Sequence, residues 1–252
     1  MFVVGHPDGH VVIWQRAHAA MCAQVARAWG NEAFGEVEPR AVVELAAERH
    51  EMGMDGEQPE LNPETGLPKD YDALSHAEHL PRQFDGPERL AAMDPYAGLL
   101  ASLHHASFYR RTSPLAVLTR DGRIERRGLR RTGRLQRRLR EQLHPDEAQV
   151  ERNRRLVRYW DGLTHDLLAH RWPRARENVP AANGELRTIR LTTKGSDPDV
   201  VLTLDPWPFR DERQHFRATG RLLRERYATQ AQLRAAFDAA DEVELGFVLE
   251  AA

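Results

Sequence analysis

Apolar residues near both ends of the chain fall in short runs that are typical of β-strands. Residues 2–4 and 11–14 flank His6-Pro-Asp-Gly9, and proline followed by Asp-Gly supplies the backbone torsions of a tight turn, so a β-hairpin is predicted there. A second hairpin is predicted around residues 194–198, and residues 242–250 form a final strand after an amphipathic helix over 230–240. Because an isolated hairpin is only marginally stable, both termini are expected to share one small antiparallel sheet.

The middle of the chain has apolar residues spaced three and four apart, which predicts helices. Met21, Val25 and Trp29 form one such stripe within residues 17–29, and a second helix is predicted from Pro39 to His50, ending near Gly53. Further helices are predicted over residues 76–84, 87–93, 95–109, 133–143 and 146–172, with the last two separated by His144-Pro145. Residues 55–71 contain three prolines and two glycines, which predicts a long loop that borders the functional site.

These elements predict a mainly α protein whose helical bundle carries the small antiparallel sheet of the two termini. We expect a single domain over residues 1–252: a hairpin at 1–15, a helical core at 16–172, and a hairpin, helix and final strand at 185–252 packed on that core. The chain shows no internal repeat of fixed period.

Composition is that of an ordinary globular protein. Hydrophobic residues make up 41% and charged residues 29% of the 252 residues, and the net charge of -2 indicates no particular partner. The single cysteine, Cys22, excludes an internal disulfide and is predicted to be a small core residue. No run approaches the ~20 apolar residues that a membrane span needs, and the N-terminus has no basic segment before an apolar one, so we expect a cytoplasmic protein that does not bind a membrane.

Histidines and carboxylates recur on or beside the predicted helices. His18 and His50 lie on two successive helices, and an antiparallel pair of helices can bring both imidazoles together. The next candidates along the chain are His79, with His76 as its alternative, then His104, with His105 as its alternative, and Asp161. Imidazole nitrogen and carboxylate oxygen suit one or two ions of divalent iron, manganese, zinc or nickel.

The order His18, His50-Glu51, His79, His104, Asp161 resembles the ligand order of HD-domain phosphohydrolases, which are metal-dependent helical proteins. More closely, the chain resembles the bacterial family called domain of unknown function 3891. The resemblance covers positions 15 to 209 and rests on "QRAHAAMCAQVARAW", "AAERHEMG", "LNPETGLPKDY", "DPYAGLLASLHHASFYRR", "YWDGLTHDLL" and "DPWPF". It implies an HD-like bundle with His18, His50, Glu51, His79, His104 and Asp161 as metal ligands.

Two features bear on that ligand set. Glu51 stands where the family it resembles has the aspartate of a His-Asp pair, and glutamate reaches one methylene further. The only literal His-Asp pair is His165-Asp166, but adjacent helical residues diverge, whereas Asp161 and His165 share a face at four-residue spacing. Asp161 is therefore preferred as the ligand, and His165 is expected either to orient it or to face solvent.

The metal hypothesis predicts a hydrolase of a phosphate ester or a nucleotide-like small molecule that uses metal-activated water. Glu51 and Asp161 are the predicted catalytic carboxylates, with Glu51 able to bridge two ions. Arg110 and Arg111 follow His104 by more than one helical turn and are predicted to bind phosphate oxygens. The alternative is a non-catalytic ligand-binding protein on the same scaffold in which Glu51 has weakened the metal site.

Residues 120–158 contain fourteen arginines, most densely in "RRGLRRTGRLQRRLR". A basic helix can bind nucleic acid. Acidic residues nearby and the near-neutral total charge instead favour a solvated face that makes helical ion pairs, so a nucleic-acid partner is not expected.

Overall fold

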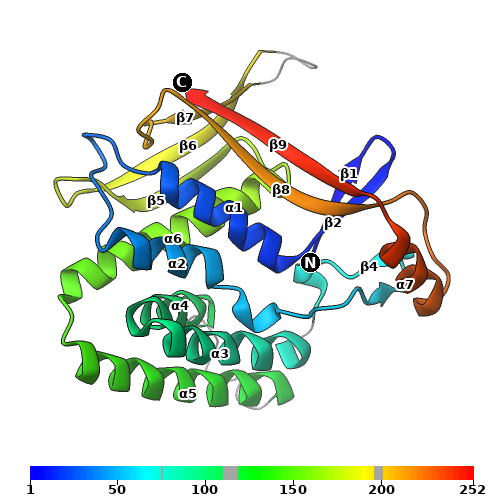
Figure 1. The fold of residues 1–252 in the computed structure, drawn as a ribbon, viewed down its shortest axis with the longest axis horizontal. Coiled ribbons are helices and arrows are strands. Elements are labelled where there is room, and N and C mark those ends of the chain that lie inside the picture. The colour runs from blue at the N-terminus through cyan, green and yellow to red at the C-terminus, as the bar shows by residue number, and fades with distance from the viewer. Residues whose placement is uncertain (75, 110–118, 196–200) are drawn as a thin grey trace.

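A large curled sheet of seven strands is the main element of the fold (Figure 1). The computed structural model describes residues 1–74, 76–109, 119–195 and 201–252. The protein is 49% helical and 25% strand, so the prediction of a mainly α, HD-like bundle with a small sheet is wrong. The strands of both termini do lie in one sheet, in the order β1-β2-β8-β9-β7-β6-β5, and β7 and β9 pair in parallel.

The elements have the following bounds. The strands are β1 (Phe2–His6), β2 (Gly9–Ile13), β3 (Leu61–Asn62), β4 (Leu67–Pro68), β5 (Arg174–Pro180), β6 (Leu186–Lys194), β7 (Val201–Asp205), β8 (Arg213–Leu223) and β9 (Glu242–Ala251). The α-helices are α1 (Gln15–Ala28), α2 (Arg40–Arg49), α3 (His76–Met93), α4 (Pro95–Tyr109), α5 (Arg120–Leu143), α6 (Glu147–Leu168) and α7 (Gln230–Ala239). Two 3₁₀ turns, η1 (Met52–Met54) and η2 (Tyr71–Ala73), lie in the connection between α2 and α3.

Two strands that the sequence pattern did not reveal enlarge the sheet. β8 pairs with both β2 and β9, and its buried residues alternate with arginines and other polar residues on the exposed side. β5 is an edge strand that exposes most of its side chains and has no apolar run. Strands were predicted from runs of β-branched residues, which β5 and β8 lack. Both strands are held in the sheet by backbone pairing with their neighbours.

The N-terminal hairpin is confirmed, and its turn shows why a glycine is needed there. Phe2 to His6 pair with Ile13 to Gly9. Gly9 has a φ of 143°, and a Cβ at this position would overlap the backbone of Leu223 in β8. Only glycine allows the hairpin to lie this close to the neighbouring strand.

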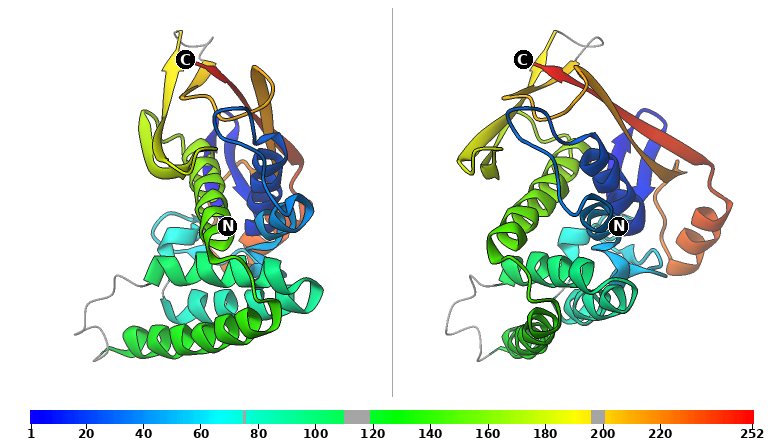
Figure 2. Two further views of the ribbon diagram at one scale, coloured as in Figure 1. Left: turned by 90° about the vertical axis from the view of Figure 1, so that its left-hand side faces the viewer. Right: turned by 60° about the vertical axis from the view of Figure 1, so that its left-hand side comes forward.

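Helices α1–α6 form two tiers beneath the sheet, and α7 lies beside its end (Figures 1 and 2). α1 packs against β8 and α6 packs against β5, and these two helices also contact each other. α4 contacts both α2 and α6, while α3 and α5 pack beside α4 on the side away from the sheet. Of the helices in the described ranges, none combines the length and the apolar composition needed to cross a membrane.

α3 is one continuous helix and not the two that were predicted over residues 76–84 and 87–93. Pro81 and Pro87 both lie inside it. A proline within a helix leaves the carbonyl four residues earlier without its donor. For Pro87 that carbonyl belongs to Gln83, and it accepts a hydrogen bond from His105 Nδ1 at 2.9 Å. A side chain of α4 therefore replaces the lost backbone donor and ties α3 to α4.

α5 begins at Arg120, well before the predicted start at residue 133. The Thr119 hydroxyl caps its first turn by accepting from the amide of Gly122 at 3.0 Å. Gly128 lies against the ring of Phe84 in α3, so close that a Cβ would overlap it. Glycine has a low helix propensity, so the glycines of this segment weaken the sequence signal for a helix. The close packing of α5 on α3 explains why Gly128 is a glycine.

A cluster of aromatic side chains joins the helices to the sheet. Trp29, at the end of α1, packs edge-on against Trp160 of α6 and against Phe209, and Phe209 in turn contacts Phe216 of β8. All four side chains are fully buried. This cluster fixes α1 and α6 against each other and so sets the positions of the polar side chains that both helices carry.

Candidate metal centre

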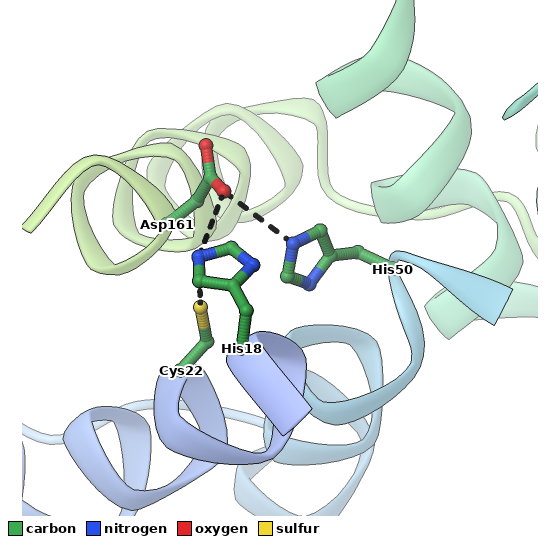
Figure 3. A group of neighbouring side chains, drawn as sticks. All are labelled: His18, Cys22, His50 and Asp161. Atoms are coloured by element: carbon green, nitrogen blue, oxygen red, sulfur yellow. Dashed lines mark hydrogen bonds and ion pairs between the residues drawn. The ribbon is translucent and has the colours of Figure 1, made fainter. Parts of the chain in front are cut away.

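Asp161 lies at the centre of a group of histidines from four separate segments. Its carboxylate oxygens lie 3.6 Å from His18 Nε2, 3.5 Å from His50 Nε2, 3.6 Å from His104 Nε2 and 3.4 Å from His165 Nε2. His18 comes from α1, His50 from the end of α2, His104 from α4, and Asp161 and His165 from α6. Figure 3 shows the carboxylate of Asp161 directed at the rings of His18 and His50.

The end of α2 places His50 and Glu51 beside this carboxylate. His50 is the C-cap residue, and its Nδ1 lies 2.7 Å from the carbonyl oxygen of Ala47. The chain then turns into η1, where Gly53 contacts Gly86 of α3 so closely that a Cβ on either residue would overlap backbone. This contact presses the segment after His50 onto α3 and holds Glu51 with its side chain almost fully buried.

A threonine and a cysteine hold the ring of His18. His18 Nε2 lies 2.8 Å from Thr164 Oγ1, and Cys22 Sγ lies 3.0 Å from the same hydroxyl oxygen. The Thr164 hydroxyl is also within hydrogen-bond distance of the carbonyl oxygens of Trp160 and Asp161, one turn earlier on α6. Thr164 therefore ties the His18 ring to the helix that carries Asp161.

Aromatic rings cover the cluster on the side of His165. Phe2 contacts the rings of both His18 and His165, and Tyr71 contacts His165, with ring centroids 4.8–4.9 Å apart. Tyr71 belongs to the long connection that was predicted to border the site. His165 is the most exposed of the four histidines, with 20% of its side chain accessible.

Burial and mutual charge set the protonation states. Burial, followed by the neighbouring His165, holds the pKa of His18 well below its usual 6.5, and burial does the same for His104. Burial opposes ionisation of Asp161, but the surrounding imidazoles, chiefly His165 and His50, outweigh it and hold the pKa of Asp161 well below 3.8. Burial also opposes protonation of His50, yet Asp161 and Glu51 together raise its pKa. The cluster thus combines a carboxylate with the neutral imidazoles of His18 and His104.

Several buried nitrogen and oxygen atoms in the cluster lack a hydrogen-bond partner. A carbonyl can only accept, so His50 Nδ1 donates to Ala47. When the His50 ring is neutral, the lone pair of its Nε2 therefore faces the Asp161 carboxylate. Two acceptors that face each other repel unless a cation lies between them. In the described part of the protein, His18 Nδ1, His50 Nε2, Glu51 Oε2 and both nitrogens of His104 are buried without a hydrogen-bond partner.

The distances also fit a bound ion. Two ligand atoms that are each about 2.1 Å from one metal lie roughly 3.0–3.5 Å apart at octahedral or tetrahedral angles. The nitrogen-to-oxygen distances of 3.4–3.6 Å around Asp161 are close to that value. Candidate ligand atoms of His18, Cys22, His50 and Asp161 all lie within 4.8 Å of one another and all four residues are buried. The cluster could therefore hold a metal ion.

Cys22 differs from the other members of this group. Burial and the nearby Asp161 charge raise the pKa of its thiol, so the free side chain is a neutral thiol that hydrogen-bonds Thr164. Metal ligation needs a thiolate. The donors best prepared for an ion are therefore the imidazoles and carboxylates.

The structure brings together His18, His50, Glu51, His104 and Asp161 from the predicted ligand set. His79 falls in α3, where only its backbone is described, and Arg110 and Arg111 lie outside the described residues. His105, the alternative to His104, instead donates to Gln83. Sequence analysis did not assign Thr164 or Cys22 to the site. Their only signal was spacing, since Thr164 follows Asp161 by three residues and Cys22 follows His18 by four.

A buried cluster of imidazoles and carboxylates, held by α1, α2, α4 and α6 beneath a curled sheet, defines a candidate metal-binding protein. The chain belongs to the family described as Protein of unknown function (DUF3891), whose family model matches residues 1–225. The predicted resemblance to domain of unknown function 3891 is thereby confirmed. Comparison with curated proteins and with solved structures gave no match.

Proposed function

We propose that this protein is a metal-dependent hydrolase of a phosphate ester or a nucleotide-like small molecule. The observation that carries the proposal is the Asp161 carboxylate, which faces buried imidazole nitrogens of His18, His50 and His104 at 3.5–3.6 Å. These donors suit iron, manganese, zinc or nickel. When bound, a divalent ion lowers the pKa of water enough to supply hydroxide near neutral pH, and it offsets negative charge on a phosphoryl group.

Each side chain of the cluster would have its own role in the reaction. His18, His50, His104 and Asp161 would hold the ion, and Thr164 would orient the His18 ring. Glu51 lies with Oε1 3.8 Å from His50 Nε2 and also lines a surface hollow of about 320 Å³ beside α1. Its side chain is as buried as that of Asp161, but because it borders this hollow it is our candidate to accept a proton from an attacking water molecule.

A basic hollow supports an anionic substrate. It has a volume of about 590 Å³ and lies between α6 and β5, and its charged lining is formed mainly by Arg154, Arg155, Arg158, Arg174 and Arg176. Glu151 pairs with the first two of these arginines, and Asp166 pairs with the last two. Within the described ranges, Arg158 has no carboxylate partner.

Arg158 lies about one helical turn from the cluster, both along its own helix α6 and along the neighbouring helix α4. It precedes Asp161 by three residues on α6. It also donates to the hydroxyl of Ser107 at 3.1 Å, three residues after His104 on α4, and its guanidinium lies over the ring of Phe108. A guanidinium without a carboxylate partner can form paired hydrogen bonds to phosphate oxygens. Arg158 is therefore our candidate for binding phosphate oxygens, while Arg110 and Arg111, which were predicted for this role, lie outside the described residues.

A non-catalytic ligand-binding protein is the second candidate. Burial supports it, because His18 and His104 have no exposed surface and only 5% of Asp161 is accessible. An ion held this deeply can be structural. In that case the arginine hollow would bind an anion without converting it.

The test is hydrolysis of a panel of aryl phosphate monoesters and diesters by protein loaded with manganese or iron. We expect turnover that is lost in Asp161→Asn and retained in Asp166→Asn, a buried aspartate on the same helix that pairs with arginines and lies outside the cluster. Arg158→Gln should raise KM more than it lowers kcat. Stoichiometric metal without turnover of any ester would favour the binding protein, and equal turnover by Asp161→Asn would refute the proposed site.

A further inference from the structure

The outer face of α5 carries a dense row of arginines. The helix contains ten arginines, no lysine and three acidic residues, Asp121, Glu125 and Glu141. Glu125 is buried. The exposed arginines are Arg120, Arg123, Arg126, Arg127, Arg130, Arg134, Arg137 and Arg138. We call this set the α5 arginine face.

Helical ion pairs do not account for the α5 arginine face. Such pairs form on α6, where Glu151 binds Arg154 and Arg155. On α5, two arginines outside this set form ion pairs: Arg131 pairs with Asp85 and Glu88, and Arg140 pairs with Glu147. The described ranges hold no ion pair or hydrogen bond for the side chains of Arg126, Arg127, Arg130 and Arg137.

The geometry concentrates positive charge in one line. Arg126, Arg130, Arg134 and Arg138 are spaced four apart, so they lie one above the next, and like charges at this spacing repel. A hollow of about 400 Å³ is lined by arginines alone, namely Arg123, Arg126, Arg127, Arg130 and Arg134. At 1.5 Å per residue the helix extends about 36 Å. A row of this length attracts an extended anion more strongly than a small one.

We propose that the α5 arginine face binds the phosphate backbone of double-stranded nucleic acid, without regard to sequence. α5 has no Phe, Trp or Tyr on which an unpaired base can stack. Its apolar side chains pack inward: Leu135 and Leu139 are buried in the core, and Ile124, Leu129 and Leu143 are partly buried against core clusters. None of them is exposed, so the helix has no free apolar face to insert into a bilayer. Arginine matches phosphate oxygens with paired hydrogen bonds. Helix α5 lies at the end of the molecule away from the sheet (Figure 2).

The experiment measures binding of a fluorescent 20-base-pair duplex of arbitrary sequence by anisotropy, between about 50 and 200 mM salt. The test variant is Arg126→Gln/Arg130→Gln/Arg134→Gln. Glutamine keeps helix propensity close to that of arginine. A matched control removes three exposed arginines from the sheet side of the molecule, namely Arg171→Gln/Arg190→Gln/Arg234→Gln, and a rescue variant places lysine at all three α5 positions.

We expect the wild-type affinity to fall steeply with salt. The α5 glutamine variant should bind at least about tenfold more weakly at low salt, and its slope of log affinity against log salt should be shallower by about 2.7, because each lost phosphate contact removes about 0.9. The control should bind within about twofold of the wild type, and the lysine variant should recover most of the affinity.

Three results would overturn the proposal. The first is the absence of duplex binding by the wild type at about 50 mM salt. The second is an equal loss of affinity in the α5 variant and the control, which would indicate a non-local charge effect. The third is binding to vesicles of phosphatidylserine without binding to the duplex, which would assign the face to an anionic lipid surface.

Discussion

Replacing Asp161 with asparagine tests the role of the central carboxylate at almost constant shape. The substitution removes the charge that faces His18, His50 and His104 at 3.5–3.6 Å, while a similar volume remains in the core. An ion at a concentration of 100 times its Kd stabilises the folded protein by about 2.7 kcal/mol. For a chain of this length, each kcal/mol corresponds to about 2–4 °C in Tm. Addition of manganese or iron should therefore raise the wild-type Tm by about 5–10 °C.

The assay is differential scanning fluorimetry with and without metal, on protein first treated with a chelator. We expect Asp161→Asn to lose the metal-dependent shift. Asp166→Asn is the matched control, because Asp166 is equally buried on α6 but pairs with Arg176 Nε at 2.7 Å. Loss of that charged hydrogen bond costs about 1.5–3 kcal/mol, so its starting Tm should fall while the metal shift remains. A full metal shift in Asp161→Asn would refute the argument.

Two further predictions concern stability. In metal-free protein, burial holds the pKa values of His18 and His104 below 6.5. Below pH 6.5 the unfolded chain therefore binds protons that the folded state does not, and urea denaturation should show the free energy of unfolding falling by about 1.4 kcal/mol per pH unit for each histidine. The pKa of His50 is raised, so His50 acts in the opposite direction, and only above pH 6.5. Stability that is constant between pH 7.5 and 5.5 would contradict these protonation states. On α5, Gly128→Ala should destabilise the protein by about 1–3 kcal/mol because its Cβ would overlap Phe84, whereas Gly133→Ala meets nothing within 4 Å and should stabilise it by up to about 1 kcal/mol. Equal effects of the two alanines in a thermal melt would show that α5 does not pack on α3 through Gly128.

The sequence could indicate that the site residues lie close together, because this depends on which residues share the face of a helix. His18 and Asp161 lie on α1 and α6, whose apolar stripes are clear, and His50 lies where a helix ends before Gly53. Once those helices pack together, their polar positions meet. The spacing of four residues between Asp161 and His165 likewise indicated a shared face, and their side chains are 3.4 Å apart.

The full sheet was harder to predict from the sequence, because its stability depends on pairing between strands that are distant in sequence. β8 has polar residues at alternate positions, including Arg217 and Arg221, and its buried side includes Phe216, Ala218 and Gly220, which gives a weak local pattern. Its place between β2 and β9 is decided by register with residues far away in sequence.

The continuity of α3 was hidden for a similar reason. Pro87 predicts a break, and the donor that satisfies the freed carbonyl of Gln83 is His105, from the next helix. No local pattern in α3 shows that this donor is present. The contact becomes visible only when α3 and α4 are packed side by side.

Metal content is the most direct test of the central claim that the buried cluster around Asp161 binds a transition metal ion. The protein should be purified without a histidine tag or chelator, incubated with manganese or iron, desalted and measured by elemental analysis. We predict that the wild type and His215→Ala, an exposed histidine on β8, retain one or two equivalents per chain, and that His50→Ala and Asp161→Asn retain none. The same metal content in all four proteins, or no metal in the wild type, would contradict the account.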